Sequence, residues 1–280
     1  MGAELLDGRA VAEGIQDEVA RAVKAMPVPP GLATVLVGDD AASAMYVRRK
    51  RTLCVEAGIR DLHRHLPART SQAELTELVA ELARDPGVSG ILVQLPLPAH
   101  LDPRATVARI PADKDVDGLT VASAGRLAQR EPGLRPCTPS AVIAILDAYD
   151  LPIAGAEAVV VGRSDLVGRP LAAMLLERNA TVTVCHRGTA DLRAVCRRAD
   201  LLVVAAGVPE LIGPDHVRPG AVVVDVGIHR GPGGLRGDVR FDAVAPIASR
   251  ITPVPGGVGP MTIAMLLRNT VDAARLAQGG

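Results

Sequence analysis

The sequence predicts an α/β protein built from two α/β domains. Short apolar runs of strand length alternate with helix-like segments along the 280 residues, and this alternation is typical of parallel sheets covered by helices. The chain length suits about two domains of roughly 150 residues each. A turn-rich stretch at 151–155 interrupts the alternation once, after which it restarts. We therefore expect one sheet in each half of the chain.

Local signals place the elements of both halves. Ser71 and Glu74 have the spacing of a capping box, which marks a helix start. Thr138-Pro139 supplies a hydroxyl cap and a first-turn proline to another helix. Helices are expected at about 8–25, 41–57, 71–85 and 138–149, and after residue 260. Strands are expected at about 33–37, 60–66, 90–94, 157–161, 180–185, 201–205 and 221–226.

Composition and charge exclude several classes of function. The formal net charge is zero and aromatic residues make up only 1% of the chain, so the basic surface and stacking side chains used in nucleic-acid binding are missing. The longest apolar runs have strand length, and the acidic N-terminal stretch lacks the apolar segment of a secretory signal. We expect no nucleic-acid partner, no membrane association and a cytoplasmic location.

The cysteines and histidines do not indicate a metal site. The four cysteines, at positions 54, 137, 185 and 196, include no Cys-x-x-Cys pair and have no histidine at ligand spacing. His63 and His65 alternate along a predicted strand, where two imidazoles on one face are more often exposed than metal-binding. We predict reduced, mostly buried thiols and no metal.

Lys50 is the residue that points most clearly to chemistry. Only three of the 31 basic residues are lysines. Arginine stays protonated at any accessible pH whereas an ammonium can release its proton, so lysine is the type retained where a proton must move. Tyr46 precedes Lys50 by four residues, and a helix therefore places both on one face. The pair predicts a general acid/base site; the alternative is a solvated basic helix face.

Two further polar residues of the first half are candidates for the same site. Gln94 ends a thoroughly apolar strand, where its amide could hydrogen-bond the lysine amine and orient it. Asp117 lies in the turn Lys114-Asp-Val-Asp-Gly118, and a carboxylate suits a heterocycle that bears an amino group beside a ring N–H. The alternatives are an edge cap for Gln94 and an Asp-Gly turn for Asp117.

The second half carries a nucleotide-binding signature. Gly162 follows an apolar strand, and Gly168 opens a helix whose free N–H groups can hold a phosphate. The next strand ends in Cys185-His186-Arg187, where an NAD-binding domain places an acidic residue. A cation there favours a ribose phosphate, so we predict NADP rather than NAD, with Arg163 and Arg187 as its partners. The alternative is two ordinary exposed arginines.

A second glycine-rich segment, residues 253–260, precedes the final helix. Its glycine content exceeds what a simple turn needs, and backbone N–H groups at a helix start can contact a ligand. This segment is therefore a candidate for ligand binding.

Together these segments resemble the bifunctional methylenetetrahydrofolate dehydrogenase/methenyltetrahydrofolate cyclohydrolase family. The resemblance spans nearly the whole chain and keeps the order of the family, which makes seven individually weak motifs specific in combination. The motifs are Ser43-x-x-Tyr-Val-x-x-Lys50, Val93-Gln-Leu-Pro-Leu-Pro98, Lys114-Asp-Val-Asp-Gly118, Pro136-Cys-Thr-Pro139, Gly162-Arg-Ser-x-x-Val-Gly-x-Pro170, Asp225-Val-Gly-Ile228 and Pro253-Val-Pro-Gly-Gly-Val-Gly-Pro260.

The resemblance implies a catalytic N-terminal domain, residues 1–121, completed by the C-terminal helix at 258–280, and a Rossmann-type NADP-binding domain, residues 122–257. It implies NADP-dependent oxidation of 5,10-methylenetetrahydrofolate to 5,10-methenyltetrahydrofolate, followed by hydrolysis to 10-formyltetrahydrofolate. It also implies a cytoplasmic homodimer with the folate bound in the cleft between the domains.

Carried onto this sequence, the family pattern implies a role for each matching residue. Lys50 corresponds to the catalytic lysine, with Tyr46 and Gln94 beside it and Asp117 holding the pterin. The expected folate-lining residues are Val93, Leu95, Pro255, Gly256, Gly257, Val258 and Gly259. The expected NADP contacts are Gly162, Arg163, Ser164, Arg187 and Ile228.

Two other interpretations stay open on the sequence. A shikimate-type NADP-dependent dehydrogenase also pairs a lysine with an aspartate, but it does not require Tyr46 and Lys50 together with the loop at 255–259. A non-catalytic dinucleotide-binding sensor has no need of the four polar residues of the first half.

The sequence departs from the commoner family residues at Ser140-Ala141 and at His229. Neither departure affects a residue with an expected catalytic role.

Overall fold

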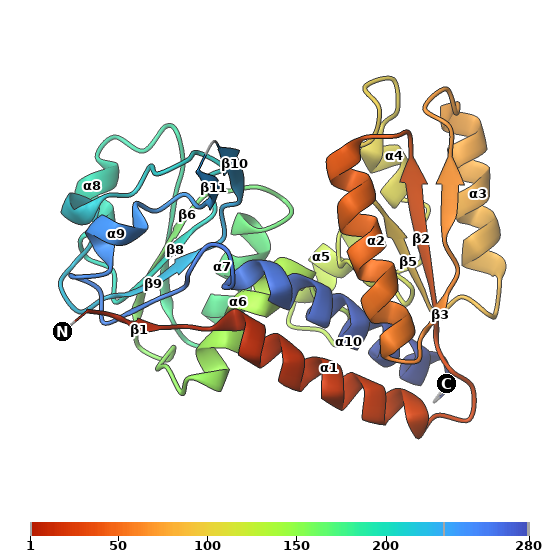
Figure 1. The fold of residues 1–280 in the computed structure, drawn as a ribbon, viewed down its shortest axis with the longest axis horizontal. Coiled ribbons are helices and arrows are strands. Elements are labelled where there is room, and N and C mark those ends of the chain that lie inside the picture. The colour runs from red at the N-terminus through yellow and green to blue at the C-terminus, as the bar shows by residue number, and fades with distance from the viewer. Residues whose placement is uncertain (1, 232, 279–280) are drawn as a thin grey trace. The chain divides into compact units, whose positions relative to one another are not determined.

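Figure 1 shows the computed structural model of the chain, which describes residues 2–231 and 233–278. The chain forms two compact units, and each is considered by itself. Unit 1 comprises residues 1–13 and 138–262, and unit 2 comprises residues 14–137 and 263–280. Compared with the predicted domains, residues 1–13 belong with the second half and residues 122–137 with the first. The predicted domains are defined by the ligand that each is expected to bind, so their boundaries remain a prediction.

Unit 2 is built around a small parallel sheet. Its strands are β2 (Gly31–Val37), β3 (Arg60–Asp61), β4 (Arg64–Leu66) and β5 (Gly90–Val93). Its helices are α2 (Ala41–Glu56), α3 (Gln72–Arg84), α4 (Pro103–Val107), α5 (Val121–Ala128) and the greater parts of α1 (Gly8–Lys24) and α10 (Val258–Gln278).

Strand β2 is the centre of this sheet, because each of the other three strands pairs with it, and all seven of its residues are buried. It pairs in parallel with β5 through residues 32–35, with β3 through residues 31–32 and with β4 through residues 35–37. The strand predicted at 60–66 is therefore two short strands. Between them the His63 ring contacts the Thr34 carbonyl oxygen, with Nδ1 at 3.0 Å. The core of this sheet is formed by Ala33, Val35, Val37, Leu75, Val79, Leu82, Val88, Ile91, Val93, Leu101 and Ile110.

Helix α10 is anchored in unit 2 by a buried amide. Asn269 is 6% exposed and donates from Nδ2 to the carbonyl oxygens of Val116 and Arg135, each at 2.8 Å. Arg268 forms an ion pair with Glu18 of α1 at 2.6 Å. Because a buried amide needs hydrogen-bond partners, Asn269 fixes the C-terminal helix beside the turn that follows Val116.

Unit 1 contains a parallel sheet whose strand order, over the described residues, is β1-β12-β9-β8-β6-β7. All five pairings are parallel, so the predicted α/β class with parallel sheets is confirmed. The strands are β1 (Glu4–Leu5), β6 (Glu157–Val161), β7 (Thr181–Cys185), β8 (Leu201–Val204), β9 (Val222–Asp225) and β12 (Arg250–Ile251). The remaining elements are α6 (Cys137–Ala148), α7 (Gly168–Glu177), α8 (Leu192–Cys196), the 3-10 helix η1 (Pro214–His216), α9 (Phe241–Val244) and the hairpin of β10 (His229–Gly231) and β11 (Gly234–Arg236).

The order of these strands creates a natural ligand edge. Strand β6 lies between β7 and β8, so the direction in which successive strands are added reverses at β6. In open α/β sheets, ligands bind outside the carboxyl ends of the strands at such a reversal. Strands β1 and β12 were not expected, because two-residue strands carry no periodicity; they form by pairing with each other and with β9.

Among the described helices, none has both the length and the apolar character needed to cross a lipid bilayer. All four cysteines are free and buried, as the sequence predicts.

Replacing Ser71 by alanine is expected to lower the free energy of unfolding by about 1 kcal/mol, because the capping box of α3 would be lost. Ser71 Oγ accepts a hydrogen bond from the Glu74 amide at 3.3 Å, and Glu74 Oε2 accepts one from the Ser71 amide at 2.8 Å. Urea denaturation followed by circular dichroism measures the change. Ser71→Thr keeps the hydroxyl and is the control; an equal loss in both variants would contradict the capping role.

Candidate active site

Lys50 and Gln94 are brought together in unit 2. Lys50, just past the middle of α2, donates from Nζ to Gln94 Oε1 at 3.0 Å. Gln94 directly follows β5; its backbone amide donates to the Val35 carbonyl at 2.9 Å and its Nε2 to the Leu95 carbonyl at 2.6 Å. The second hydrogen bond determines which way the amide faces, since only its oxygen is then available to the amine. Gln94 is therefore placed to orient the lysine amine.

The rest of the basic run around Lys50 has other partners or faces solvent. Arg51 forms an ion pair with Asp61 at 2.7 Å, and Arg49 is exposed. Tyr46 lies one turn before Lys50 on α2 and is 40% exposed. A phenol and an amine four residues apart on a helix lie on neighbouring positions of one face, so Tyr46 is available to a ligand that reaches Lys50.

Asp117 lies within electrostatic reach of Lys50. Burial raises the pKa of Asp117, while the positive charge of Lys50 opposes that rise and the neighbouring charge of Asp115 adds to it. The Cys137 side chain beside it also acts to lower the pKa of Asp117. The turn that presents Asp117 needs a glycine next, because Gly118 has φ +69° and a Cβ there would overlap the backbone of Pro136.

Asp115 was not identified as a site residue from the sequence, yet it shapes the turn that carries Asp117. It is 1% exposed and accepts hydrogen bonds from the Leu119 amide at 3.1 Å, the Thr120 amide at 2.8 Å and Ser123 Oγ at 2.6 Å. A buried carboxylate holds its donors tightly because no water replaces them. The signal in the sequence that could have identified Asp115 is the second carboxylate in the turn at 114–118.

Cys137 was also missed as a neighbour of the site. Its sulfur donates to the Val116 carbonyl oxygen at 3.2 Å. Burial, followed by the charge of Asp117, raises the pKa of the Cys137 thiol well above its usual range. A thiol held protonated is a hydrogen-bond donor rather than a nucleophile, so its role beside Asp117 is structural.

The predicted nucleotide turn lies at the carboxyl end of β6. Gly162 has φ +129°, and a Cβ on it would overlap the carbonyl oxygen of Ala205 after β8. A Cβ on Gly168, the first residue of α7, would overlap the Gly162 carbonyl. Both glycines are therefore required by backbone contacts at the strand-order reversal. Ser164 Oγ accepts the Val167 amide at 3.2 Å, which helps to order the turn before α7.

The side chains at this edge fit a dinucleotide that carries an additional phosphate. Arg163 and Ser164 in the turn, Arg187 after β7 and Ile228 after β9 are all exposed, and each follows the carboxyl end of a strand. Two exposed guanidinium groups can bind a ribose phosphate, and a glycine at 162 allows a pyrophosphate to approach the backbone closely.

Two buried carboxylates, which the sequence did not reveal as a pair, hold the loops of this edge together. Asp238 is fully buried and accepts the amides of Ala206 at 2.6 Å and Gly207 at 2.9 Å, and His229 Nε2 lies 2.7 Å from its Oδ1. Asp225, at the end of β9, is 4% exposed. It accepts the amides of Gly227, Asp238 and Val239 at 2.8–3.0 Å. The signal in the sequence was an aspartate ending an apolar strand.

The predicted folate-lining residues divide between the two units. Val93 belongs to the core of unit 2 and is 4% exposed, and Leu95 is half-buried. Pro255 is exposed, whereas Val258 at the start of α10 is 3% exposed. Val93 and Val258 therefore expose little surface to a ligand, whereas Leu95 and Pro255 are accessible.

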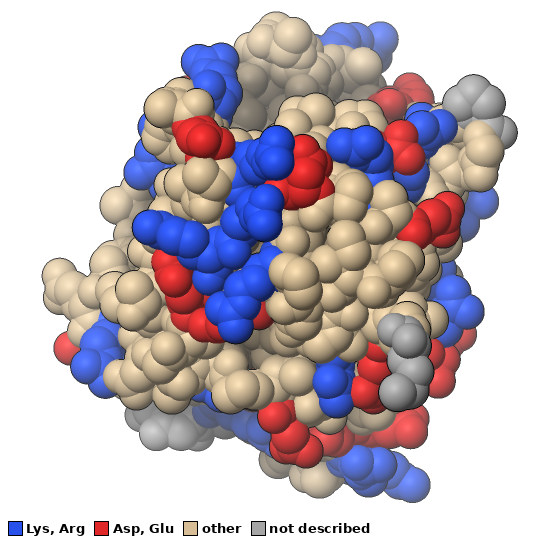
Figure 2. All heavy atoms as spheres, turned by 90° about the vertical axis from the view of Figure 1, so that its left-hand side faces the viewer, with Lys and Arg blue, Asp and Glu red and all other residues tan. Residues whose placement is uncertain are grey.

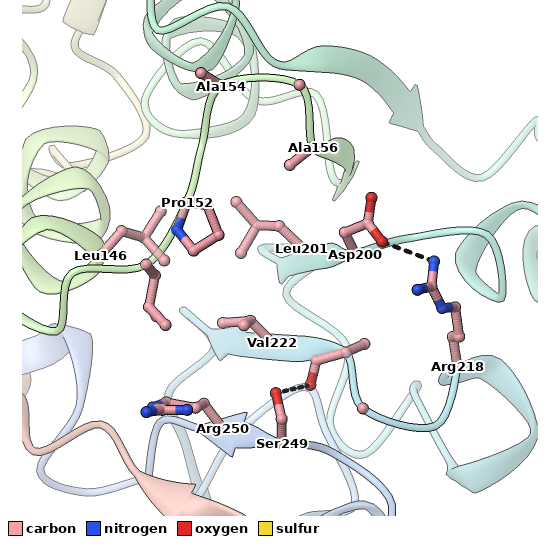
Figure 3. Close-up of a pocket in the computed structure, with 14 residues that line it drawn as sticks. Leu146, Pro152, Ala154, Ala156, Asp200, Leu201, Arg218, Val222, Ser249 and Arg250 are labelled. Atoms are coloured by element: carbon pink, nitrogen blue, oxygen red, sulfur yellow. Dashed lines mark hydrogen bonds and ion pairs between the residues drawn. The ribbon is translucent and has the colours of Figure 1, made fainter.

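Unit 1 contains a cavity of about 470 Å³ that none of the predicted site residues lines (Figure 3). It is lined by residues at the amino ends of β6, β8, β9 and β12, the edge opposite to Gly162, and by the loop before β6. The two arginines that line it are already ion-paired, Arg218 with Asp200 at 2.7 Å and Arg250 with Glu4 at 2.8 Å. Since open α/β sheets bind ligands at the carboxyl edge, we do not assign this cavity to the cofactor.

Charges are mixed on the surface, as Figure 2 shows for one face, where basic side chains lie among acidic ones. Ion pairs such as Arg198 with Glu157 account for part of this mixing. Within residues 2–231 and 233–278, no group of three or more His, Cys, Asp or Glu side chains could hold a metal ion.

Comparison with known families gives one result for both halves of the chain. Residues 6–117 match the family described as "Tetrahydrofolate dehydrogenase/cyclohydrolase, catalytic domain". Residues 136–278 match "Tetrahydrofolate dehydrogenase/cyclohydrolase, NAD(P)-binding domain".

Individual relatives agree over the full length. The chain is 62% identical over 283 residues to "Bifunctional protein FolD 2" of Frankia casuarinae, covering 100% of this chain and 98% of that protein. It is similar to the crystal structure of the bifunctional FolD methylenetetrahydrofolate dehydrogenase/cyclohydrolase from Campylobacter jejuni, with a TM-score of 0.96, 46% identity and coverage of 98% and 99%. The Trypanosoma brucei enzyme, solved with NADP cofactor and inhibitor, gives a TM-score of 0.95 and 38% identity over 100% of both chains.

Asp225 is expected to make stability depend on pH. Burial raises its pKa to about 6, although backbone hydrogen bonds oppose the shift. Between about pH 4 and 6 the native state keeps a proton that the unfolded chain releases, so this contribution falls as pH rises, by about 3 kcal/mol in total from below pH 3 to pH 7. Asp225→Asn removes this titrating group. Because part of the effect is already lost at pH 4, the stability of the variant relative to the wild type should be about 2 kcal/mol more favourable at pH 7 than at pH 4.

Guanidinium denaturation of both proteins at the two pH values measures this difference. If the difference in free energy of unfolding between the wild type and Asp225→Asn is the same at pH 4 and pH 7, Asp225 is not the titrating group.

Proposed function

The chain belongs to the tetrahydrofolate dehydrogenase/cyclohydrolase family, and on that premise we propose how its residues perform the two reactions. The protein is a bifunctional enzyme that oxidises 5,10-methylenetetrahydrofolate to 5,10-methenyltetrahydrofolate with NADP and hydrolyses the product to 10-formyltetrahydrofolate. The observation that carries the assignment of residues is the Lys50–Gln94 hydrogen bond with Asp117 nearby. The shikimate-type and sensor interpretations do not account for the family match and are set aside.

NADP is the cofactor, and we propose that it is held at the carboxyl edge of the unit 1 sheet. The exposed guanidinium groups of Arg163 and Arg187 bind the ribose phosphate, and Ser164 and the Gly162 turn contact the pyrophosphate and ribose. Ile228 offers an apolar surface, 42% exposed, to a flat ring. When bound, NADP supplies the nicotinamide ring that accepts the hydride.

Asp117 binds the pterin in this proposal. The amino group and adjacent ring N–H of a pterin present two parallel donors, and a carboxylate accepts both with its two oxygens. The turn held by Asp115 keeps Asp117 in one orientation. Because Asp117 is held near Lys50, binding the pterin head also brings the reactive carbon toward the amine.

Lys50 is the general acid/base of the hydrolysis. Water must add to a cationic amidine-like carbon and a proton must reach the departing nitrogen. Gln94 holds the amine at 3.0 Å, so its proton has a defined direction before the substrate arrives. Tyr46, exposed one turn earlier on α2, is placed to hydrogen-bond the same substrate.

The other predicted folate contacts complete the proposal. Val93, Leu95 and residues 255–259 line the folate, with Leu95 and Pro255 offering the more accessible surface. The family resemblance is the support for these contacts. It also supports a homodimer and a cytoplasmic location, which we propose on the same ground.

A spectrophotometric assay with methylenetetrahydrofolate tests the function. NADP should be reduced, with little accumulation of the methenyl absorbance band, because the hydrolysis removes that product. NAD should be a poorer substrate than NADP, since NAD lacks the ribose phosphate that Arg163 and Arg187 would bind. Absence of cofactor reduction with either nucleotide would reject the dehydrogenase assignment, and accumulation of the methenyl band would reject a strong cyclohydrolase.

Lys50→Met should lose hydrolysis by at least roughly a hundredfold, the usual contribution of general acid/base catalysis, while NADP binding is unchanged. Hydrolysis is followed by the decay of added methenyltetrahydrofolate, and NADP binding by isothermal titration calorimetry. Lys24→Met is the matched control, because Lys24 is an exposed lysine in the last turn of α1. A folded Lys50→Met protein that loses both properties equally would overturn the catalytic role.

A further inference from the structure

The first residues of the chain and the glycine-rich loop before α10 leave the same edge of the unit 1 sheet. Strand β1 pairs in parallel with β12, with Glu4 opposite Arg250 and Leu5 opposite Ile251. The Leu6 amide continues the ladder by donating to the Ile251 carbonyl at 2.9 Å, and the Leu6 side chain is fully buried. After this pairing one segment enters α1 and the other enters the loop at 253–257.

The start of α1 is held in place by its own cap. Asp7 Oδ1 accepts the amides of Arg9 at 2.9 Å and Ala10 at 3.3 Å, and the Asp7 amide donates to the Tyr149 hydroxyl at 2.8 Å. The first turn of α1 is therefore a rigid surface, because its free amides and its entry angle are both fixed. The position of a segment that packs against this first turn is therefore set by α1.

The loop at 253–257 packs directly against that first turn. The Arg9 amide also donates to the Gly256 carbonyl at 3.0 Å, and a Cβ built on the buried Gly8 would overlap the carbonyl group of Gly257. The overlapping atoms are backbone, so they cannot rotate away as a side chain can. The loop itself has little freedom, since Gly256 has φ +115° and the Gly257 amide donates to the Pro253 carbonyl at 2.8 Å.

We propose that Gly8 is a positioning residue for folate binding: its missing side chain lets the loop at 255–259 lie against α1 in the place where it contacts the substrate. This inference rests on the proposed folate contact of that loop. A methyl group at position 8 must displace the Gly257 carbonyl, and with it the neighbouring folate contacts. A displacement of about 1 Å at a substrate-positioning group can reduce rates by as much as a hundredfold.

The test compares steady-state kinetics of Gly8→Ala with those of the wild type. The KM for methylenetetrahydrofolate should rise roughly tenfold or more, and clearly more than the KM for NADP, because the loop itself moves whereas Ile228, beside Gly259, is the expected NADP contact next to it. A purely structural defect would instead reduce the amount of active enzyme, lowering the apparent kcat and leaving both KM values unchanged.

Gly14→Ala is the matched control, because Gly14 lies in the same helix, is exposed and has no atom within 4 Å of an added Cβ. It should leave both KM values unchanged. A second, milder variant, Asp7→Ala, removes the cap of α1 and should raise the folate KM less than Gly8→Ala does. Ser71→Ala, which removes a cap elsewhere, should not change it.

Pro255→Ala, within the loop, separates failure of the inference from failure of the contact it depends on. If Pro255→Ala raises the folate KM and neither Gly8→Ala nor Asp7→Ala does, the positioning role of Gly8 is refuted and the folate contact stands. If none of the three raises it, the proposed folate contact of the loop fails, and the inference fails with it. If Gly8→Ala does not fold, Asp7→Ala against Ser71→Ala decides the question.

Discussion

Hydrogen bonds from loop amides to buried carboxylates hold both candidate sites in shape. Asp115 in unit 2, and Asp225 and Asp238 in unit 1, are 1%, 4% and 0% exposed. Each accepts at least two backbone amides. A carboxylate taken out of water is costly unless such donors replace its hydration, so moving one of these loops would leave a buried charge without partners. The need to keep these donors on the buried carboxylates therefore fixes the positions of the loops that carry Asp117 and Ile228.

The balance between burial and hydrogen-bond donors also separates the carboxylates that hold loops from Asp117, which we propose binds the substrate. Asp115 is surrounded by donors from its own turn, whereas Asp117 lies where the charge of Lys50 opposes the pKa rise caused by burial. Lys50 in turn is held by Gln94, whose other hydrogen bond goes to the backbone. Structural and chemical roles are thus carried by different side chains a few residues apart, and either can be changed separately.

The sequence by itself determined the α/β alternation and the residue types of the chemistry. The helices expected at 8–25 and 41–57 are α1 and α2, and the strand expected at 157–161 is β6. These elements carry local signals, such as hydrophobic periodicity, caps and a glycine after an apolar run. The rarity of lysine singled out Lys50, and the order of seven motifs indicated the family that the comparisons then confirmed.

Only the tertiary structure decided which distant residues share a contact. The pairing of β1 with β12, the sharing of Asp238 between two loops and the approach of Gly8 to Gly257 join segments far apart in the chain. None of these segments has a periodicity or a turn signal that names its partner. Their contacts follow from sheet order and from the need to satisfy buried polar groups, and these act on the folded chain as a whole. A glycine that only a neighbouring backbone requires, such as Gly8, looks in the sequence like any other.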